Sequence, residues 1–196
     1  LLCRCGRGTS VAMNLSLLVQ ETTDITDHIA DLWQCVVRQD AQVVVETGTA
    51  RGDSARIWAA ALTLTGGKLW SIDKDPLIGA WGDTFKRQYP QHTFLTGDSA
   101  TIPWDLPIDI LFLDSDHHYD HVLAELRHFA PWMRKGSTIF VHDSDHEAGD
   151  APGLYFSLGG NVVEAVQRFT RPHRLRWIHH PGQWGMIEIP ITKALT

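Results

Sequence analysis

Two groups of acidic and histidine side chains each follow a short apolar run of the sequence. The run 109–113 leads into Asp-Ser-Asp-His-His, and the run 137–141 leads into His-Asp-Ser. If the two runs are neighbouring strands of one parallel sheet, Asp114 and Asp143 come close together where both strands end. Two carboxylates with few compensating charges favour a hard divalent ion such as Mg²⁺, although the many histidines leave room for a softer metal.

The polar residues that follow Asp114 also have simpler interpretations. Asp116 is expected to cap the helix that begins near His118, because aspartate is a preferred N-cap residue. His118 and His121 are expected to lie on the solvated face of that helix.

A glycine-containing turn at 46–54, with the sequence ETGTARGDS, joins a buried apolar run to an alanine-rich stretch. Gly48 allows a tight turn and a close approach to a ligand. The helix that begins beyond Gly52 offers free N–H groups and a positive dipole end to a carboxylate or phosphate. The spacing is not that of the G-x-G-x-x-G dinucleotide fingerprint, and Glu46 lies two positions before the first glycine. A tight turn without a ligand is the alternative.

Two further strand ends carry groups that could bind a nucleoside. Asp73 lies 27 residues after Glu46, one βαβ length, and its carboxylate can accept hydrogen bonds from both ribose hydroxyls. A solvated acid or a helix cap is the alternative, and Asp75 is a competing candidate. Asp98 and Ser99 follow the next strand, where they could meet an adenine amino group or cap a helix.

The candidate residues come together only if the fold places the ends of several strands at one edge of a sheet. Short apolar runs alternate with helical stretches, which indicates an α/β fold with a mostly parallel sheet covered on both faces. Pro181-Gly182 lies between the segments 174–179 and 184–189 and predicts a closing antiparallel hairpin. We expect helices at 25–38, 53–64, 76–89, 118–129 and 161–169, and strands at 42–46, 68–72, 92–96, 109–113, 137–141, 174–179 and 184–189.

Composition limits the classes of function. The 196 residues suit one domain, with 43% apolar and 20% charged residues, so the chain is not a disordered sequence. A net charge of −6 argues against a nucleic-acid partner, which usually needs a basic face. No apolar run approaches the roughly 20 residues that span a bilayer. Cys3, Cys5 and Cys35 are too few for a typical four-ligand zinc site, and we interpret them as reduced thiols of a cytoplasmic protein.

Taken together, these motifs resemble the class I S-adenosylmethionine-dependent methyltransferases. Within that class the sequence is similar to the small branch that includes macrocin O-methyltransferase and cephalosporin-hydroxylase-like proteins. The turn 46–52, Asp73, Gly97-Asp98, 112–117 and 136–143 carry the resemblance, which covers roughly 41–143. It implies a Rossmann-like, doubly wound sheet of seven strands, and a domain at 41–196 preceded by an N-terminal segment and leading helix at 1–40.

The resemblance also implies where S-adenosylmethionine binds. The cofactor would lie over the Gly48 turn, with its ribose on Asp73. The expected cofactor-binding residues are Glu46, Gly48, Thr49, Gly52, Ser54, Asp73, Asp98, Ser99 and Asp114.

In the metal-dependent members of the family, one ligand follows the fourth strand and two adjacent ligands follow the fifth. Asp114 matches the first position, and His142 with Asp143, or Asp143 with Ser144, matches the pair. The usual pair is two acids, or an acid and an amide, so this chain departs from the family at His142 and Ser144. A histidine three residues after the strand-four acid serves as the base in the macrolide-sugar members, and His117 matches it.

We therefore expect an S-adenosylmethionine-dependent O-methyltransferase that acts on a small-molecule hydroxyl with the help of a divalent metal such as Mg²⁺. One alternative is a non-haem metal-dependent oxygenase, because 118–120 reads His-x-Asp. Another is a nucleoside-binding module without catalysis. The glycine-rich segment 145–160 is expected to contact the substrate or simply to connect two elements.

Overall fold

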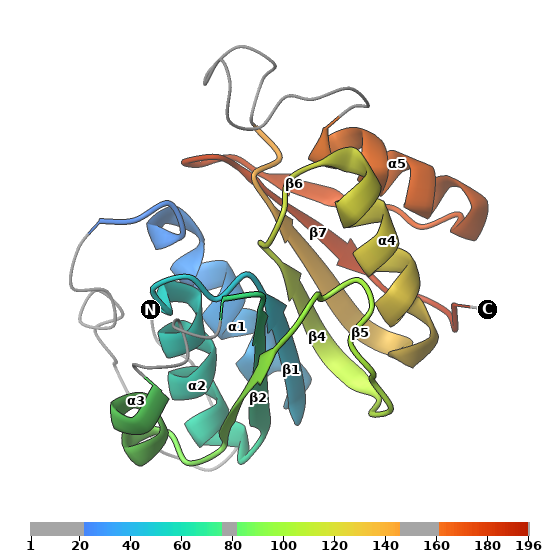
Figure 1. Ribbon diagram of the computed structural model, residues 1–196. Helices are drawn as coiled ribbons and strands as arrows, with labels where there is room; N and C mark the ends of the chain where they lie inside the picture. The colour runs from blue at the N-terminus through green and yellow to red at the C-terminus, as the bar shows by residue number, and fades with distance from the viewer. Residues whose placement is uncertain (1–21, 76–81, 146–160, 196) are drawn as a thin grey trace.

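The computed structural model describes residues 22–75, 82–145 and 161–195 (Figure 1). Its centre is one seven-stranded sheet with the order β3-β2-β1-β4-β5-β7-β6. The first five strands pair in parallel, and β7 pairs antiparallel with both β5 and β6. The predicted doubly wound sheet with a terminal antiparallel hairpin is therefore confirmed. The strands are β1 (Val43–Thr47), β2 (Lys68–Asp73), β3 (His92–Thr96), β4 (Ile108–Leu113), β5 (Met133–His142), β6 (Ile178–His180) and β7 (Met186–Pro190).

Helices cover both faces of the sheet, with α1 and α2 on one face and α4 and α5 on the other (Figure 1). Alternate strand residues fill the two cores, because successive side chains of a strand point to opposite faces. Val44 belongs to the core under α1 and α2, and Val45 to the core under α4 and α5. The helices are η2 (Thr26–His28), α1 (Ile29–Gln39), α2 (Asp53–Thr65), α3 (Gly82–Gln88), α4 (Tyr119–Phe129), η4 (Ala130–Trp132) and α5 (Val162–His173).

The expected strand 174–179 is wrong for its first four residues. Helix α5 continues to His173 and ends at Arg174, which has a left-handed backbone with φ of 51°. Thr170 continues the buried face of Val166 and Phe169 beyond the expected end, and its hydroxyl donates to the carbonyl of Val166 at 2.8 Å. Only Ile178–His180 remain to pair with β7.

Some sequence predictions fall on other parts of the chain. Cys3, Cys5, the first part of the helix expected at 76–89, and the segment 146–160 lie outside the described residues. Among the helices that are described, none has the length and apolar character needed to cross a membrane.

Candidate active site

The turn between β1 and α2 approaches the end of β4 very closely. Gly48 has a φ of +76°, and a Cβ atom built on it would lie 2.0 Å from the backbone oxygen of Asp114 and 2.6 Å from Cα of Ser115. Any other residue would therefore collide with backbone, in a conformation that favours glycine. The sequence predicted the need for glycine, but the close neighbour that the structure shows is the chain after β4.

Asp73, at the end of β2, holds this turn in place. Its Oδ2 accepts hydrogen bonds from the backbone N–H groups of Thr49 (3.0 Å) and Ala50 (3.2 Å), and its Oδ1 accepts one from Asp75 (3.0 Å). Each carboxylate oxygen has two lone pairs, so Oδ1 keeps an acceptor site. The structure thus gives Asp73 a structural role that the sequence did not predict.

Glu46 is completely buried beneath the turn. Its two oxygens accept hydrogen bonds from Ser54 (2.9 Å) and Ser71 (2.5 Å), and Ser71 also contacts Nε2 of His92 at 2.9 Å. Burial raises the pKa of Glu46 to about 8, although the two serine hydrogen bonds oppose the shift. A pKa near 8 keeps Glu46 mostly protonated at neutral pH, where it supports the turn from beneath. It is not among the described residues that line the two cavities found beside the turn.

Two cavities meet at Gly48. The larger, of about 330 Å³, opens between the ends of β2, β3 and β4, and the smaller, of about 90 Å³, lies on the side of α2 and of the segment before η2. The lining of the larger cavity includes Gly48, Asp73, Gly97, Ser99, Ser115 and His121. The lining of the smaller one includes Asp24, Gly48, Thr49, Ser54 and Asp114.

Asp98 and Asp116 each accept a hydrogen bond from the backbone N–H two residues later in the chain. Asp98 lines neither cavity, and its Oδ1 accepts the N–H of Ala100 at 3.0 Å in a turn. Asp116 does line the larger cavity, but it does not cap α4 directly. It accepts a hydrogen bond from the N–H of His118 (3.0 Å) and contacts the ring Nδ1 of the same residue.

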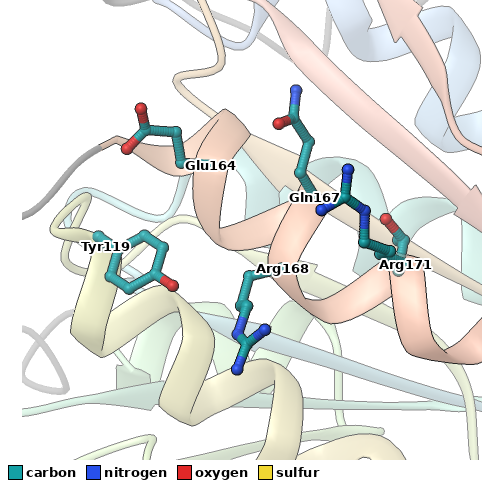
Figure 2. Close-up of a pocket in the computed structure, with 6 residues that line it drawn as sticks. Tyr119, Glu164, Gln167, Arg168 and Arg171 are labelled. Atoms are coloured by element: carbon teal, nitrogen blue, oxygen red, sulfur yellow. The ribbon is translucent and has the colours of Figure 1, made fainter.

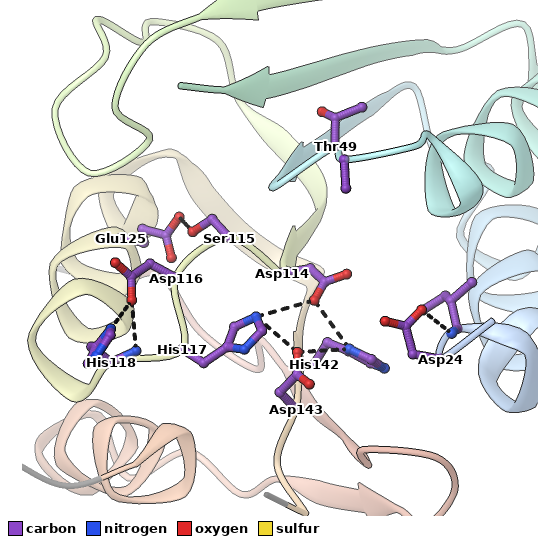
Figure 3. A network of polar contacts seen from close by, with 12 residues as sticks. Asp24, Thr49, Asp114, Ser115, Asp116, His117, His118, Glu125, His142 and Asp143 are labelled. Carbon is purple, nitrogen blue, oxygen red and sulfur yellow. Dashed lines mark hydrogen bonds and ion pairs between the residues drawn. The ribbon is translucent and has the colours of Figure 1, made fainter. Parts of the chain in front are cut away.

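Beside the smaller cavity, Asp114, His117, His142 and Asp143 form a compact cluster (Figure 3). Nε2 of His117 lies 3.0 Å from Oδ2 of Asp143 and 3.8 Å from Oδ1 of Asp114. Nδ1 of His142 lies 3.1 Å from Oδ2 of Asp143 and 3.2 Å from Oδ1 of Asp114. The parallel pairing of β4 with β5 brings the two carboxylates together, and Asp143 adopts a left-handed φ of 59° at the end of β5.

The cluster is mostly buried, and the charges of its members offset one another. Burial alone would lower the pKa of His142, but the Asp114 and Asp143 carboxylates raise it to about 10. Burial would likewise lower the pKa of His117, and the contacts with Asp143 and then Asp114 raise it. Burial raises the pKa of Asp114, whereas the two imidazoles hold that of Asp143 well below its usual range in spite of burial.

Ligand atoms of Asp114, His117 and Asp143 all lie within 4.8 Å of one another, so these three residues could hold a metal ion. Two carboxylate oxygens and one imidazole nitrogen suit a divalent ion. His142, expected as a ligand, points Nδ1 at the two carboxylates, and its Nε2 is buried with no hydrogen-bond partner among the described residues. The His-x-Asp triplet at 118–120 is absent from this group, which was sought among the described residues only.

A second polar network was not expected from the sequence. Glu125, on the buried side of α4, accepts hydrogen bonds from Ser99 (2.5 Å) and Ser115 (2.7 Å). Nε2 of His121 lies 3.3 Å from Oγ of Ser99, and this ring lines the larger cavity, so the expected solvated position of His121 is wrong. The one signal in the sequence is that Glu125 lies between Val122 and Phe129, on the face of α4 that is otherwise apolar.

A wider hollow, of about 590 Å³, lies between α4 and α5 (Figure 2). Tyr119, Glu164, Gln167, Arg168, Thr170 and Arg171 line it. None of the residues predicted to bind cofactor or metal belongs to this lining, so the strand-end cavities define the candidate site.

Comparison with known proteins agrees with this geometry. A family of methyltransferase domains matches residues 45–144, just over half of the 196 residues. The match runs from within β1 to just past the end of β5, and therefore includes the Gly48 turn and the Asp114 cluster. The chain belongs to this methyltransferase family. The narrower resemblance to the macrocin branch stays a prediction.

Solved structures share the fold at low sequence identity. An SAH-bound methyltransferase of Podospora anserina matches with a TM-score of 0.65 and 13% identity over 90% of this chain and 85% of that one. An O-methyltransferase from Bacillus cereus in complex with SAH gives 0.62 and 16% over 89% and 85%. Human N-acetylserotonin methyltransferase in complex with SAM gives 0.59 and 13% over 83% of this chain and 51% of the human one.

Proposed function

We propose that this protein transfers the methyl group of S-adenosylmethionine to a hydroxyl oxygen of a small molecule. The observation that carries the proposal is the meeting of two cavities at Gly48, directly beside the Asp114 cluster. The larger cavity suits the adenosine part of the cofactor and the smaller one the amino-acid part. S-Adenosylhomocysteine or S-adenosylmethionine is bound in the three neighbours named above, which supports this choice of ligand.

Asp73 is the proposed ribose ligand. It lines the larger cavity at the end of β2, and its Oδ1 keeps a free acceptor position. Because the same carboxylate holds the Gly48 turn, ribose binding and the shape of the turn depend on each other. Glu46 and Ser54 support the turn from beneath instead of contacting the ribose, since each is satisfied by the other.

His117 is the proposed acceptor of the substrate proton. In the reaction, a bond forms between the acceptor oxygen and the methyl carbon while the sulfur–methyl bond breaks, and the hydroxyl proton passes to Nε2 of His117. This leaves S-adenosylhomocysteine and a methyl ether. The ring must be neutral with Nε2 unprotonated before the transfer, because an Nε2–H would leave no lone pair for the proton. Oδ2 of Asp143, 3.0 Å from that nitrogen, would accept a hydrogen bond from the ring once it is protonated.

Asp114 and Asp143 are the proposed holders of a divalent ion such as Mg²⁺. A histidine would supply the third ligand. His117 is the better candidate than His142, because its ring nitrogen belongs with both carboxylates to the group whose ligand atoms all lie within 4.8 Å of one another. A bound divalent ion would lower the pKa of the acceptor hydroxyl. His117 is then either the base or a ligand, and the two roles make different predictions.

Calorimetric titration with S-adenosylhomocysteine tests the cofactor site. Asp73→Asn keeps one oxygen for the turn but loses the charge that strengthens hydrogen bonds to the ribose, so affinity should fall at least about tenfold. Asp75→Asn, which removes the competing exposed carboxylate, is the matched control and should bind normally. Wild-type protein that binds neither S-adenosylhomocysteine nor S-adenosylmethionine would refute the proposal.

Methyl transfer to a panel of phenols, catechols and sugar hydroxyls, followed by mass spectrometry, tests the reaction. His117→Gln should slow it by about 10²–10⁴ if His117 is the base, with Mn²⁺ affinity unchanged. Loss of Mn²⁺ affinity would instead make His117 a ligand. Full activity after exhaustive chelation would exclude the metal, and binding without transfer to any acceptor would favour a nucleoside-binding module.

A further inference from the structure

Glu125 is a buried carboxyl group that the reaction described above does not use. It projects from α4 toward the sheet, and within the described ranges no lysine or arginine pairs with it. Its Oε1 instead accepts hydrogen bonds from Ser99 at 2.5 Å and from Ser115 at 2.7 Å (Figure 3 draws Glu125 with Ser115). Removing a carboxyl group from water is strongly unfavourable unless such donors compensate for the lost hydration.

These hydrogen bonds fix the direction of both serine hydroxyls. A hydroxyl has one proton to donate and two lone pairs that can accept. Because both protons point to Glu125, the oxygens can offer only lone pairs to the 330 Å³ cavity that both serines line. Nε2 of His121 then donates toward Ser99, 3.3 Å away. Oε1 of Glu125 lies 3.6 Å from the same nitrogen and raises the pKa of His121, which favours a ring that carries protons.

We propose that Glu125 is a positioning residue that holds Ser99 and Ser115 as hydrogen-bond acceptors, so that this end of the cavity selects a base with an amino group. Adenine presents a 6-amino donor, whereas hypoxanthine presents a 6-oxo acceptor that would face oxygen lone pairs. The inference rests on the proposed function, because it takes the larger cavity as the adenosine site. It assigns to Glu125 a part in cofactor selection, although Glu125 is not among the residues that line the cavity.

The test compares S-adenosylhomocysteine with S-inosylhomocysteine by calorimetry, in wild-type protein and in Glu125→Gln. Wild-type protein should prefer the adenosine form by at least about tenfold, because a site built for a donor rejects an acceptor. Both serines contact Oε1, and Oε2 is buried without a hydrogen-bond partner among the described residues. The amide nitrogen of Glu125→Gln should therefore take the Oε1 position, where it donates to the serines and lets their own protons turn to the cavity. The preference should fall at least about threefold. Asp120→Asn removes an exposed carboxylate from the same helix and should leave it unchanged.

The ratio of the two affinities separates positioning from stability. A merely structural Glu125 would weaken both ligands by the same factor, so an unchanged ratio in a folded Glu125→Gln overturns the inference. If that variant does not fold, Ser99→Ala and Ser115→Ala take its place, and an unchanged ratio in both has the same meaning. Wild-type protein that binds no S-adenosylhomocysteine overturns the proposed function as well, whereas normal binding with an insensitive ratio overturns this inference alone.

Discussion

Replacing Glu46 with glutamine should stabilise the protein, and the gain should grow as the pH rises. The Glu46 side chain is fully buried, and burial raises its pKa from an ordinary 4.5 to about 8. The unfolded chain releases this proton near pH 4.5, so folding at neutral pH must take a proton up again. Glutamine has nearly the same shape and needs no proton. Its amide can hydrogen-bond with the same serines, Ser54 and Ser71.

The sign and size of the effect follow from the two pKa values. Between about pH 4.5 and 8 the folded state holds more protons at Glu46 than the unfolded state does, so the free energy of unfolding falls as the pH rises. The contribution of this group is complete below pH 4.5 and is lost progressively up to about pH 8. Each pH unit is worth about 1.36 kcal/mol. At pH 7 the wild-type protein has therefore lost about 3 kcal/mol that Glu46→Gln keeps.

Urea denaturation of both proteins at about pH 5 and pH 7.5 measures the effect. The difference in free energy of unfolding should favour Glu46→Gln by about 3 kcal/mol more at the higher pH. Because the two proteins are compared at the same pH, the titration of other groups largely cancels. Glu164→Gln, at an exposed glutamate of α5, is the control and should change stability by less than about 1 kcal/mol at either pH. A difference that is equal at both pH values would show that Glu46 is ionised in the folded protein.

Three further predictions concern the scaffold of the site. Gly48→Ala should destabilise far more than Gly66→Ala, because both glycines have φ near +75° but only a Cβ at position 48 collides with the Asp114 backbone; denaturation curves should separate them by at least about 2 kcal/mol. Asp109→Asn should cost about 2 kcal/mol by the same assay, since its carboxylate accepts two N–H groups at the start of β1 (2.8 and 3.0 Å) and pairs with an arginine of β5. His92, whose pKa burial lowers to about 4, should show no imidazole titration by NMR above about pH 5.5.

The sequence was sufficient to predict the positions of the site residues that follow strands. Asp73, Asp114 and Asp143 each follow an apolar run, and parallel strands place the residues after them at one edge of the sheet. The neighbouring positions of β4 and β5 followed from the same pattern. Gly48 was predictable because the turn into α2 needs a residue without a side chain.

The sequence was insufficient where the direction of a side chain depends on a distant partner. Glu125 was not among the predicted site residues, because its contact with Ser99, 26 positions earlier, forms only when α4 packs against the sheet. His142 looked like a metal ligand, yet its Nδ1 contacts the carboxylates that would hold the ion. Local periodicity fixes which element a residue belongs to, but such contacts depend on tertiary packing.

The Asp114 cluster could be located from the sequence, but the contacts within it could not. In the folded protein its acidic and basic side chains offset one another without a cation. Two carboxylates lie against two imidazoles, and the carboxylates raise the pKa of both His117 and His142. A divalent ion on Asp114 and Asp143 would compete with the protons of these two imidazoles for the carboxylates. Binding of the ion must therefore release protons, as expected wherever ligands have to be deprotonated. Loss of its proton on metal binding would leave His117 neutral and able to accept the substrate proton. Metal binding and the protonation of His117 would then be thermodynamically linked.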